Sequence, residues 1–141
     1  MTVTKIQDVE FGVELPAFEP DTSLDNVIRF TDAAGWGGRG RFTDHEAARK
    51  EGLPGAIVPG IMSQGLLAAM IHRWAPDCKI DHIDTIFRAP VLVDHPHKIT
   101  GVVTDIDEAS GKVEVDITVS NEAGETRVFG TATVILPFDG T

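Results

Sequence analysis

The longest apolar stretch of the chain begins at Gly60 and runs to Trp74. Between Gly60 and Ile71 the only polar side chains belong to Ser63 and Gln64. A helix of this composition is apolar on nearly every face and must therefore be buried. The pattern predicts a central core helix, around which the other elements are arranged.

Two Pro-Gly pairs, at residues 54–55 and 59–60, turn the chain sharply into this helix. The first backbone N–H groups of a helix lack partners within the helix, and a buried N-terminus of this kind favours negative charge. We therefore expect the helix to begin at Gly60 with N–H groups that can stabilise a negatively charged atom.

A shorter helix is predicted near the N-terminus. Thr22 and Ser23 could cap a helix that runs through Ala34 and is ended by Gly35. Its expected buried positions are Val27, Ile28, Phe30 and Ala34.

A glycine-rich loop and a second short helix are expected next. The loop is WGGRGRF, residues 36–42, because three glycines in seven residues cannot hold regular structure without a large loss of backbone entropy. Thr43, followed three residues later by Glu46, then matches a capping box that would start a short helix ending before Gly52.

The second half of the chain changes to the period of a β-sheet. From residue 112 to 119 apolar and polar residues alternate, as in a half-buried strand, and residues 127–136 supply a second β-rich run that closes a hairpin. Residues 86–93 and 97–106 are predicted to form another antiparallel pair, bent at Pro90. Such a sheet has one apolar face to cover, and the central helix is available to cover it. The predicted fold class is α+β.

The length and the charge of the chain limit its class. Its 141 residues fit a single domain, residues 1–141, without internal repeats or linkers. Twelve basic against 22 acidic side chains give a net charge of −10, which argues against nucleic acids and anionic membranes as partners. The N-terminus lacks the apolar run of a signal peptide and the central helix is too short to span a bilayer, so we expect a soluble cytoplasmic protein.

The sequence offers no convincing metal site. Cys78 is the single cysteine, so neither a disulfide within the chain nor a site built from cysteine pairs can form. His95 and His97 flank a proline, but two ligands in a turn without a third make a weak site. We therefore expect no metal and no resident cofactor.

The order of these segments resembles the MaoC-like hydratase/dehydratase family of single hotdog domains. The most specific segments are DHEAARKEGLPGAIVPGIMSQGLLA, residues 44–68, and IFRAPV, residues 86–91. The resemblance implies a hotdog fold, in which an antiparallel sheet wraps around a central buried helix, and dimers that pair two sheets edge to edge. It also implies a site at the dimer interface for an acyl thioester carried on coenzyme A or acyl carrier protein.

Family members reversibly add water to an enoyl thioester, which requires two chemical parts. An Asp and a His in a G-D-x-N-P-x-H-x-D loop handle the proton of the water, and N–H donors at the start of the buried helix hold the thioester oxygen. Gly60 matches the family glycine that opens this helix, so its backbone N–H is the implied oxyanion donor. The histidine that many members place just before that glycine is Pro59 here.

The acid/base part departs from the family pattern. Gly35 matches the first glycine of the motif, which places Trp36 at the catalytic aspartate. Counted back from Asp44, the catalytic histidine falls on Phe42. Counted forward from Gly35 it falls on Arg41, because this loop carries one extra residue. Neither count yields a histidine, and the Asn-Pro of the motif is replaced by Gly-Gly-Arg-Gly.

Two adjacent pairs of polar residues remain as site candidates. Asp44 and His45 could form a relocated acid/base dyad, or Asp44 could favour the helix dipole beside an exposed His45. Ser63 and Gln64 could face the thioester, or they could bond the loop backbone.

The glycine-rich loop supplies further candidates. Trp36 either lines a pocket or fills the place where water would react. Arg39 and Arg41 could hold the phosphates of coenzyme A or could simply be solvated. The candidate catalytic groups are therefore the Gly60 N–H, Asp44 and His45, and the candidate substrate-binding residues are Trp36, Arg39, Arg41, Phe42, Ser63 and Gln64.

These departures lead to two hypotheses. In the first, the protein keeps the acyl-thioester scaffold, lacks the usual Asp/His pair and works beside a catalytic hotdog partner. In the second, it is an active homo-oligomer, either a hydro-lyase with relocated groups such as Asp44 or His45, or a repurposed lyase, cyclase or thioesterase. Both imply an acyl thioester as ligand and a homodimer or heterodimer of hotdog subunits.

Overall fold

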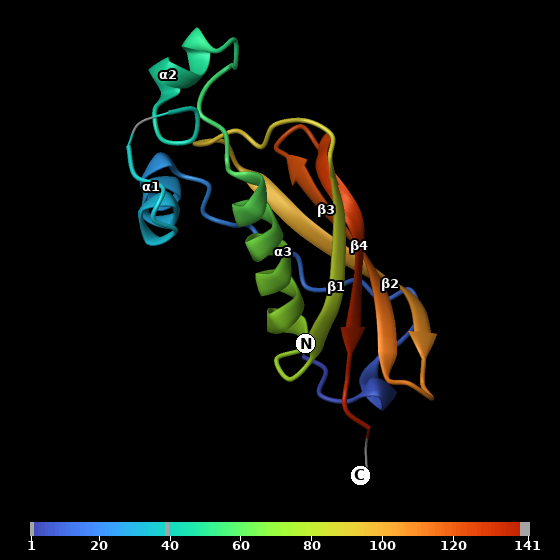
Figure 1. The fold of residues 1–141 in the computed structure, drawn as a ribbon. Helices are drawn as coiled ribbons and strands as arrows, with labels where there is room; N and C mark the ends of the chain where they lie inside the picture. The colour runs from blue at the N-terminus through green and yellow to red at the C-terminus, as the bar shows by residue number, and fades with distance from the viewer. Residues whose placement is uncertain (1, 39, 139–141) are drawn as a thin grey trace.

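Four antiparallel strands form one sheet, and the longest helix lies along one face of it (Figure 1). The computed structural model describes residues 2–38 and 40–138. Its elements in chain order are the 3-10 helix η1 (Ile6–Asp8), α1 (Leu24–Ala33), α2 (His45–Lys50), α3 (Gly60–Trp74), β1 (Lys79–Phe87), β2 (His97–Asp107), β3 (Lys112–Asn121) and β4 (Thr126–Ile135). The strand order is β1-β4-β3-β2. The predicted α+β class is confirmed.

Helix α3 is the predicted central helix. One side of it packs against the sheet, and its buried apolar residues are Met62, Leu67, Met70, Ile71 and Trp74. The other side is open in the single chain, where Ile61 is 59% exposed and Gly65 is also exposed. The expectation that the helix is buried on nearly every face is therefore wrong for the isolated subunit, because one chain covers only one side.

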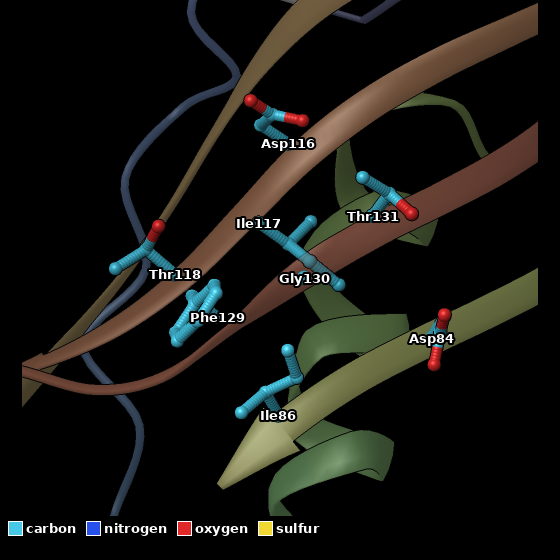
Figure 2. Close-up of a pocket in the computed structure, with 8 residues that line it drawn as sticks. All are labelled: Asp84, Ile86, Asp116, Ile117, Thr118, Phe129, Gly130 and Thr131. Carbon is cyan, nitrogen blue, oxygen red and sulfur yellow. The ribbon is translucent and has the colours of Figure 1, made fainter. Parts of the chain in front are cut away.

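The predicted hairpin of β3 and β4 is confirmed. Every second residue along β3 is buried, and these residues are Val113, Val115, Ile117 and Val119. They lie on the face that α3 covers, because successive side chains of a strand point to opposite faces. On the other face, Asp116 lies beside Thr131 of β4, and both point away from α3 (Figure 2). The sheet thus has one covered and one open face.

The predicted pairing of residues 86–93 with residues 97–106 is wrong. Strand β1 ends at Phe87 and pairs with β4, whereas β2 lies at the opposite edge of the sheet. No residue of β1 is fully buried, and neither the burial nor the sequence of this strand, KIDHIDTIF, alternates regularly. The sequence pattern therefore placed this strand too late in the chain.

The chain leaves the sheet after β1 for a local reason. The N–H groups of Arg88 and Ala89 both donate to the carbonyl of Arg127. Pro90 follows, and it has no N–H with which to continue a ladder of hydrogen bonds. The segment after β1 is therefore free to cross to the other edge of the sheet.

Helix α1 is close to its prediction. The Ser23 hydroxyl accepts the Asn26 N–H at 3.3 Å and caps the helix. Val27 is buried as expected, whereas Ala34 is exposed. Thr31 is the buried residue that the pattern missed, and it is tolerated there because its hydroxyl donates to a carbonyl one turn earlier.

Helix α2 starts one residue later than its predicted cap. Asp44, rather than Thr43, is the N-cap, and its carboxylate accepts the N–H groups of Glu46 and Ala47. A carboxylate at this place also interacts favourably with the helix dipole. The Thr43 hydroxyl instead accepts the Gly40 N–H, which closes the end of the glycine-rich loop. Both short helices lie near the start of α3 (Figure 1).

The two edges of the sheet differ. The outer edge of β2 is bridged by the N-terminal segment, through Glu14 to Val102 and Phe18 to Ile99. Within the described residues, β1 pairs with β4 alone. The N–H and C=O groups along an unpaired edge can pair with another chain. The outer edge of β1 is therefore available for pairing.

His97 is a buried polar residue at the start of β2, with 5% of its surface exposed. Its Nδ1–H donates to the His95 carbonyl at 2.8 Å, and the Thr22 hydroxyl donates to the same carbonyl. Burial lowers the pKa of His97 below its ordinary value. The folded state therefore favours the neutral imidazole.

We expect the free energy of unfolding to fall as the pH is lowered through about 6.5, the ordinary pKa of histidine. In that range the unfolded chain binds a proton at His97, whereas the folded chain, in which the pKa is lowered, does not. The fall should be smaller in His97→Asn, whose amide can still donate to the His95 carbonyl. Urea unfolding at about pH 7.5 and about pH 5.5 measures the difference.

The control for this experiment is His82→Ala, which removes the side chain of an exposed histidine in β1, away from His97. Its loss of stability between the two pH values should match that of the wild type. An equal loss in His97→Asn and in the wild type would contradict the role of the buried ring.

Candidate functional site

A cavity of about 350 Å³ opens at the start of α3. Its walls come from the helix start, from the end of β1 and from the segments beside them, and they include Phe42, Ile57, Gly60, Ser63, Phe87 and Arg88. None of the described wall residues is a carboxylate or a histidine. The cavity therefore reaches the predicted oxyanion donor but holds no described general base.

The start of α3 has unused hydrogen-bond donors. Pro59 is the N-cap residue, and its side chain has no group that could accept a bond from the helix N–H groups. No described residue accepts the backbone N–H of Gly60, Ile61 or Met62. An open helix N-terminus of this kind favours an anionic or strongly polar acceptor.

Gly60 lies close to the end of β1. A Cβ atom at this position would lie 3.1 Å from the ring of Phe87, which is tighter than most carbon contacts. The ring also forms part of the cavity wall. Because glycine has no side chain, the open N–H of the helix start and the aromatic ring can lie against the same cavity.

Ser63 and Gln64 have different surroundings although they are adjacent. Ser63 is 2% exposed, lines the cavity and makes no side-chain hydrogen bond with a described residue. Every fully buried polar side-chain atom of the described residues has a partner, so the Ser63 hydroxyl must touch the cavity. The Gln64 amide instead donates to the Thr85 hydroxyl of β1 at 2.9 Å and does not line the cavity.

Three aromatic rings pack together next to this cavity. Trp36 meets Phe30 edge to face with ring centroids 6.0 Å apart, and it meets Phe42 at 5.9 Å. Phe42 lines the cavity, whereas Trp36 does not and is 48% exposed. Ring pairs of this kind each stabilise by about 0.5–1.5 kcal/mol beyond the area that they bury. The cluster therefore holds the glycine-rich loop against α1 without any group that titrates.

Arg41, the described arginine of the loop, is not found in the cavity walls. The Arg41 guanidinium donates to the Glu51 carboxylate at 2.6 Å on the surface. Arg39 lies outside the described residues. Among the described residues, Arg88 is the cation that lines the cavity, and the sequence predictions did not include it. Its position inside the IFRAPV segment was the signal that could have found it.

The structure gives Asp44 and His45 separate roles, and neither lines the cavity at Gly60. Asp44 caps α2, whereas the His45 ring lies between Asp94 and the backbone of Ala56. The hydrogen bond from His45 is the main cause that lowers the pKa of Asp94. Both ring nitrogens of His45 are used, so neither is free to accept a proton from water.

The described residues, 2–38 and 40–138, contain no group of three or more His, Cys, Asp or Glu side chains that could hold a metal ion. His95 contacts Glu122, and the His97 ring bonds a carbonyl instead of pointing to a shared ion. No helix within these ranges is long and apolar enough to cross a membrane.

Comparison with known families identifies the domain. The model of the MaoC like domain matches residues 42–125, which is more than half of the chain. The chain belongs to this family. The resemblance predicted from the sequence is thereby confirmed. The match begins at Phe42, so Trp36 lies outside it.

Solved structures of similar fold include two (R)-hydratases. R-hydratase PhaJ1 from Pseudomonas aeruginosa has a TM-score of 0.86 and 20% identity, over 96% of this chain and 87% of that one. The (R)-hydratase from A. caviae involved in PHA biosynthesis has a TM-score of 0.85 and 19% identity, over 93% and 99% of the two chains. These likenesses confirm the predicted hotdog fold.

A third similar structure is the ChsH1-ChsH2 complex from Mycobacterium tuberculosis. Its TM-score is 0.79 and its identity is 20%, over 96% of this chain and 99% of the matched one. A search of curated proteins finds no match.

The aromatic cluster of this MaoC-like domain contains the two residues that the resemblance predicts at the acid/base positions, and that assignment stays a prediction. Trp36 occupies the implied aspartate position, and Phe42 occupies the implied histidine position counted back from Asp44. The two rings are in contact, whereas the Arg41 guanidinium is paired with the carboxylate of Glu51, the C-cap residue of α2.

The different surroundings of Ser63 and Gln64 lead to a prediction about stability. Ser63→Ala should change the free energy of unfolding by less than about 0.5 kcal/mol, because no hydrogen bond to a described residue is lost. Gln64→Ala should lower it by about 1 kcal/mol or more, because the bond to Thr85 is lost. Urea unfolding of the two matched variants measures both values. A larger loss in Ser63→Ala than in Gln64→Ala would contradict the assignment.

Proposed function

We propose that this MaoC-like domain binds an acyl thioester, of the enoyl or 3-hydroxyacyl kind, at the start of α3 and works beside a catalytic hotdog partner. The observation that carries the proposal is the cavity at Gly60, which offers hydrogen-bond donors but no described carboxylate or histidine. Binding a thioester oxygen needs donors only, whereas hydration also needs an acid and a base.

The donors suit a thioester oxygen. The Gly60 N–H belongs to the uncapped start of α3, and the Ser63 hydroxyl lines the same cavity. Both can donate to an oxygen that gains negative charge, and the helix dipole strengthens this effect at the N-terminus. The apolar walls suit an acyl chain, and they include Phe42, Ile57, Val58, Phe87 and Val91. Arg88 adds a cation that suits a phosphate of the carrier.

The aromatic cluster supports a role without proton transfer. Trp36 and Phe42 replace the two groups that would handle the water, and neither an indole nor a phenyl ring can act as a general base. His45 cannot take over this role in the observed state, because its two nitrogens are both bonded. The acid/base groups must therefore come from another subunit.

Two open surfaces support the presence of such a subunit. The outer edge of β1 is unpaired among the described residues, and the open side of α3 exposes Ile61. Phe87, at the end of β1, is 49% exposed next to the helix start. Large apolar side chains that are exposed together mark interaction surfaces. One of the similar structures is itself a complex of two different chains, ChsH1-ChsH2, which favours a hotdog partner.

The purified protein alone should bind an acyl-CoA and should not hydrate it. Calorimetric titration with short and medium trans-2-enoyl-CoA should show saturable binding, while the absorbance of the enoyl thioester stays constant. The reason is that the described cavity walls offer donors but no base. A turnover above about 1 s⁻¹, which is ordinary for an enzyme, would contradict the need for a catalytic partner. A complete lack of binding would contradict the thioester site.

The matched variants locate the binding within the cavity. Ser63→Ala should weaken acyl-CoA binding by about 3- to 10-fold, because one hydrogen bond to the thioester oxygen is lost. Gln64→Ala changes the neighbouring residue outside the cavity and should leave the Kd unchanged. Equal affinities of Ser63→Ala and the wild type would argue against the hydroxyl as a donor.

The open surfaces predict that the protein is not monomeric at micromolar concentration. Ile61→Asp places a charge on the exposed side of α3 and should weaken the assembly by at least about tenfold, because the carboxylate would be desolvated in the interface. Phe11→Asp alters another exposed apolar residue, in the N-terminal segment, and is the control. Analytical ultracentrifugation measures both. A single-chain mass for the wild type, or an unchanged assembly in Ile61→Asp, would refute the proposed interface.

A further inference from the structure

We infer that His45 is a positioning residue, which fixes the entrance segment, residues 55–58, and through it the start of α3. His45 does not line the cavity at Gly60 and would act through the backbone between them. Its effect on ligand binding rests on the proposed function, whereas its effect on the entrance segment rests on the geometry of the chain alone.

The imidazole of His45 joins two parts of the chain. Its Nδ1 lies 3.0 Å from the Ala56 backbone nitrogen, and its Nε2 lies 2.7 Å from Asp94 Oδ2. Because a backbone N–H can only donate, Nδ1 must be an unprotonated acceptor, and Nε2 must carry the hydrogen that Asp94 accepts. The two contacts therefore select one neutral tautomer of the ring.

Asp94 provides a fixed anchor for this ring. It has a φ of 68° and is the one residue other than glycine with positive φ in the described ranges. Its N–H donates to the Thr22 carbonyl at 2.8 Å, and its Oδ1 accepts the Leu24 N–H at 2.9 Å. A side chain in this conformation costs free energy and persists where its surroundings fix it. The start of α1 and His45 thus hold the Asp94 turn from two sides.

The entrance segment is packed directly against the ring of His45. A Cβ atom on Gly55 would lie 3.0 Å from His45 Nδ1, so the ring and the backbone are in close contact. The Ala56 carbonyl accepts the Val93 N–H at 2.9 Å, next to the Asp94 turn. Ala56 is therefore held at both its N–H and its carbonyl by the same cluster.

The other backbone hydrogen bonds of the entrance segment connect it to the walls of the cavity. The Ile57 N–H donates to the Arg41 carbonyl at 2.9 Å, and the Val58 N–H donates to the Val91 carbonyl at 2.8 Å. Ile57 and Val58 both line the cavity, and the next residue is the N-cap of α3. A shift at Ala56 would therefore move both the wall and the donor at Gly60.

The small cavity beside the pair, of about 200 Å³, does not make His45 a second catalytic centre. Arg49 and His95 line it together with His45 and Asp94. A histidine that acts as a general base needs one free nitrogen, and both are occupied here. His45 and Asp94 therefore fix the backbone at Ala56.

The experiment compares His45→Ala with two matched variants. His45→Asn keeps an oxygen that can accept the Ala56 N–H but loses the bond to Asp94, and His95→Ala removes an exposed histidine that does not contact the entrance segment. Hydrogen exchange of the Ala56 amide, followed by NMR, reports the position of the segment. Calorimetric titration of an acyl-CoA measures the Kd, which reports whether the donor at the helix start keeps its position.

His45→Ala should speed exchange of the Ala56 amide by about tenfold and weaken acyl-CoA binding by about 3- to 10-fold. In His45→Asn, both the protection of the Ala56 amide and the affinity for acyl-CoA should lie between those of His45→Ala and the wild type. His95→Ala should change neither the exchange rate nor the Kd. Long-range ¹H–¹⁵N spectra of the wild type at neutral pH should show the Nε2–H tautomer of His45.

Three outcomes would overturn the inference. They are an unchanged Ala56 exchange in His45→Ala, a faster exchange with an unchanged Kd, and an Nδ1–H tautomer in the wild type. If the wild type itself bound no acyl-CoA, the proposed function would fail, and the inferred effect on binding would fail with it. An unchanged Kd in His45→Ala beside a wild type that binds would overturn the positioning role alone.

Discussion

The packing of one side of α3 against the sheet is the interaction on which the rest of the structure depends. It buries most of the large apolar side chains of the helix, and burial of such side chains stabilises a fold by about 1.5–3 kcal/mol each. The same packing places the helix start against Phe87 at the end of β1. Because Pro59 cannot cap the helix, the first N–H groups remain open beside the cavity. One helix thus provides the core, the donors and an exposed apolar side.

The described walls of the cavity provide hydrogen-bond donors but no acid or base for proton transfer. Hydrogen-bond donors are in place, because a backbone N–H follows from the helix start and needs no particular side chain. Proton transfer needs particular side chains at particular places, and the family resemblance predicts Trp36 and Phe42 at those places instead. The aromatic contacts stabilise the glycine-rich loop, so the loop keeps its position without the family's acid/base groups. The proposed function therefore separates binding from proton transfer within this MaoC-like scaffold.

The pair of His45 and Asp94 shows how a histidine and a carboxylate can serve structure rather than catalysis. Their separation of 2.7 Å would suit a catalytic dyad. The deciding contact is the one on the other side of the ring, where Nδ1 accepts a backbone N–H. A ring held at both nitrogens fixes two segments relative to one another and leaves no site for a proton from a substrate. This is also why Asp94 can keep an unusual backbone conformation.

The sequence by itself determined the central helix, the β3–β4 hairpin, the glycine-rich loop and the family, because these depend on local periodicity, on Pro and Gly and on a continuous segment. It also located the open donor at Gly60. Only the tertiary structure decided that β1 pairs with β4, that α3 keeps one side open and that His45 meets Asp94, 49 residues away. It alone separated Ser63 from Gln64, since neighbours on a helix point in directions about 100° apart. Contacts between distant segments depend on how the whole chain packs, and no local pattern encodes them.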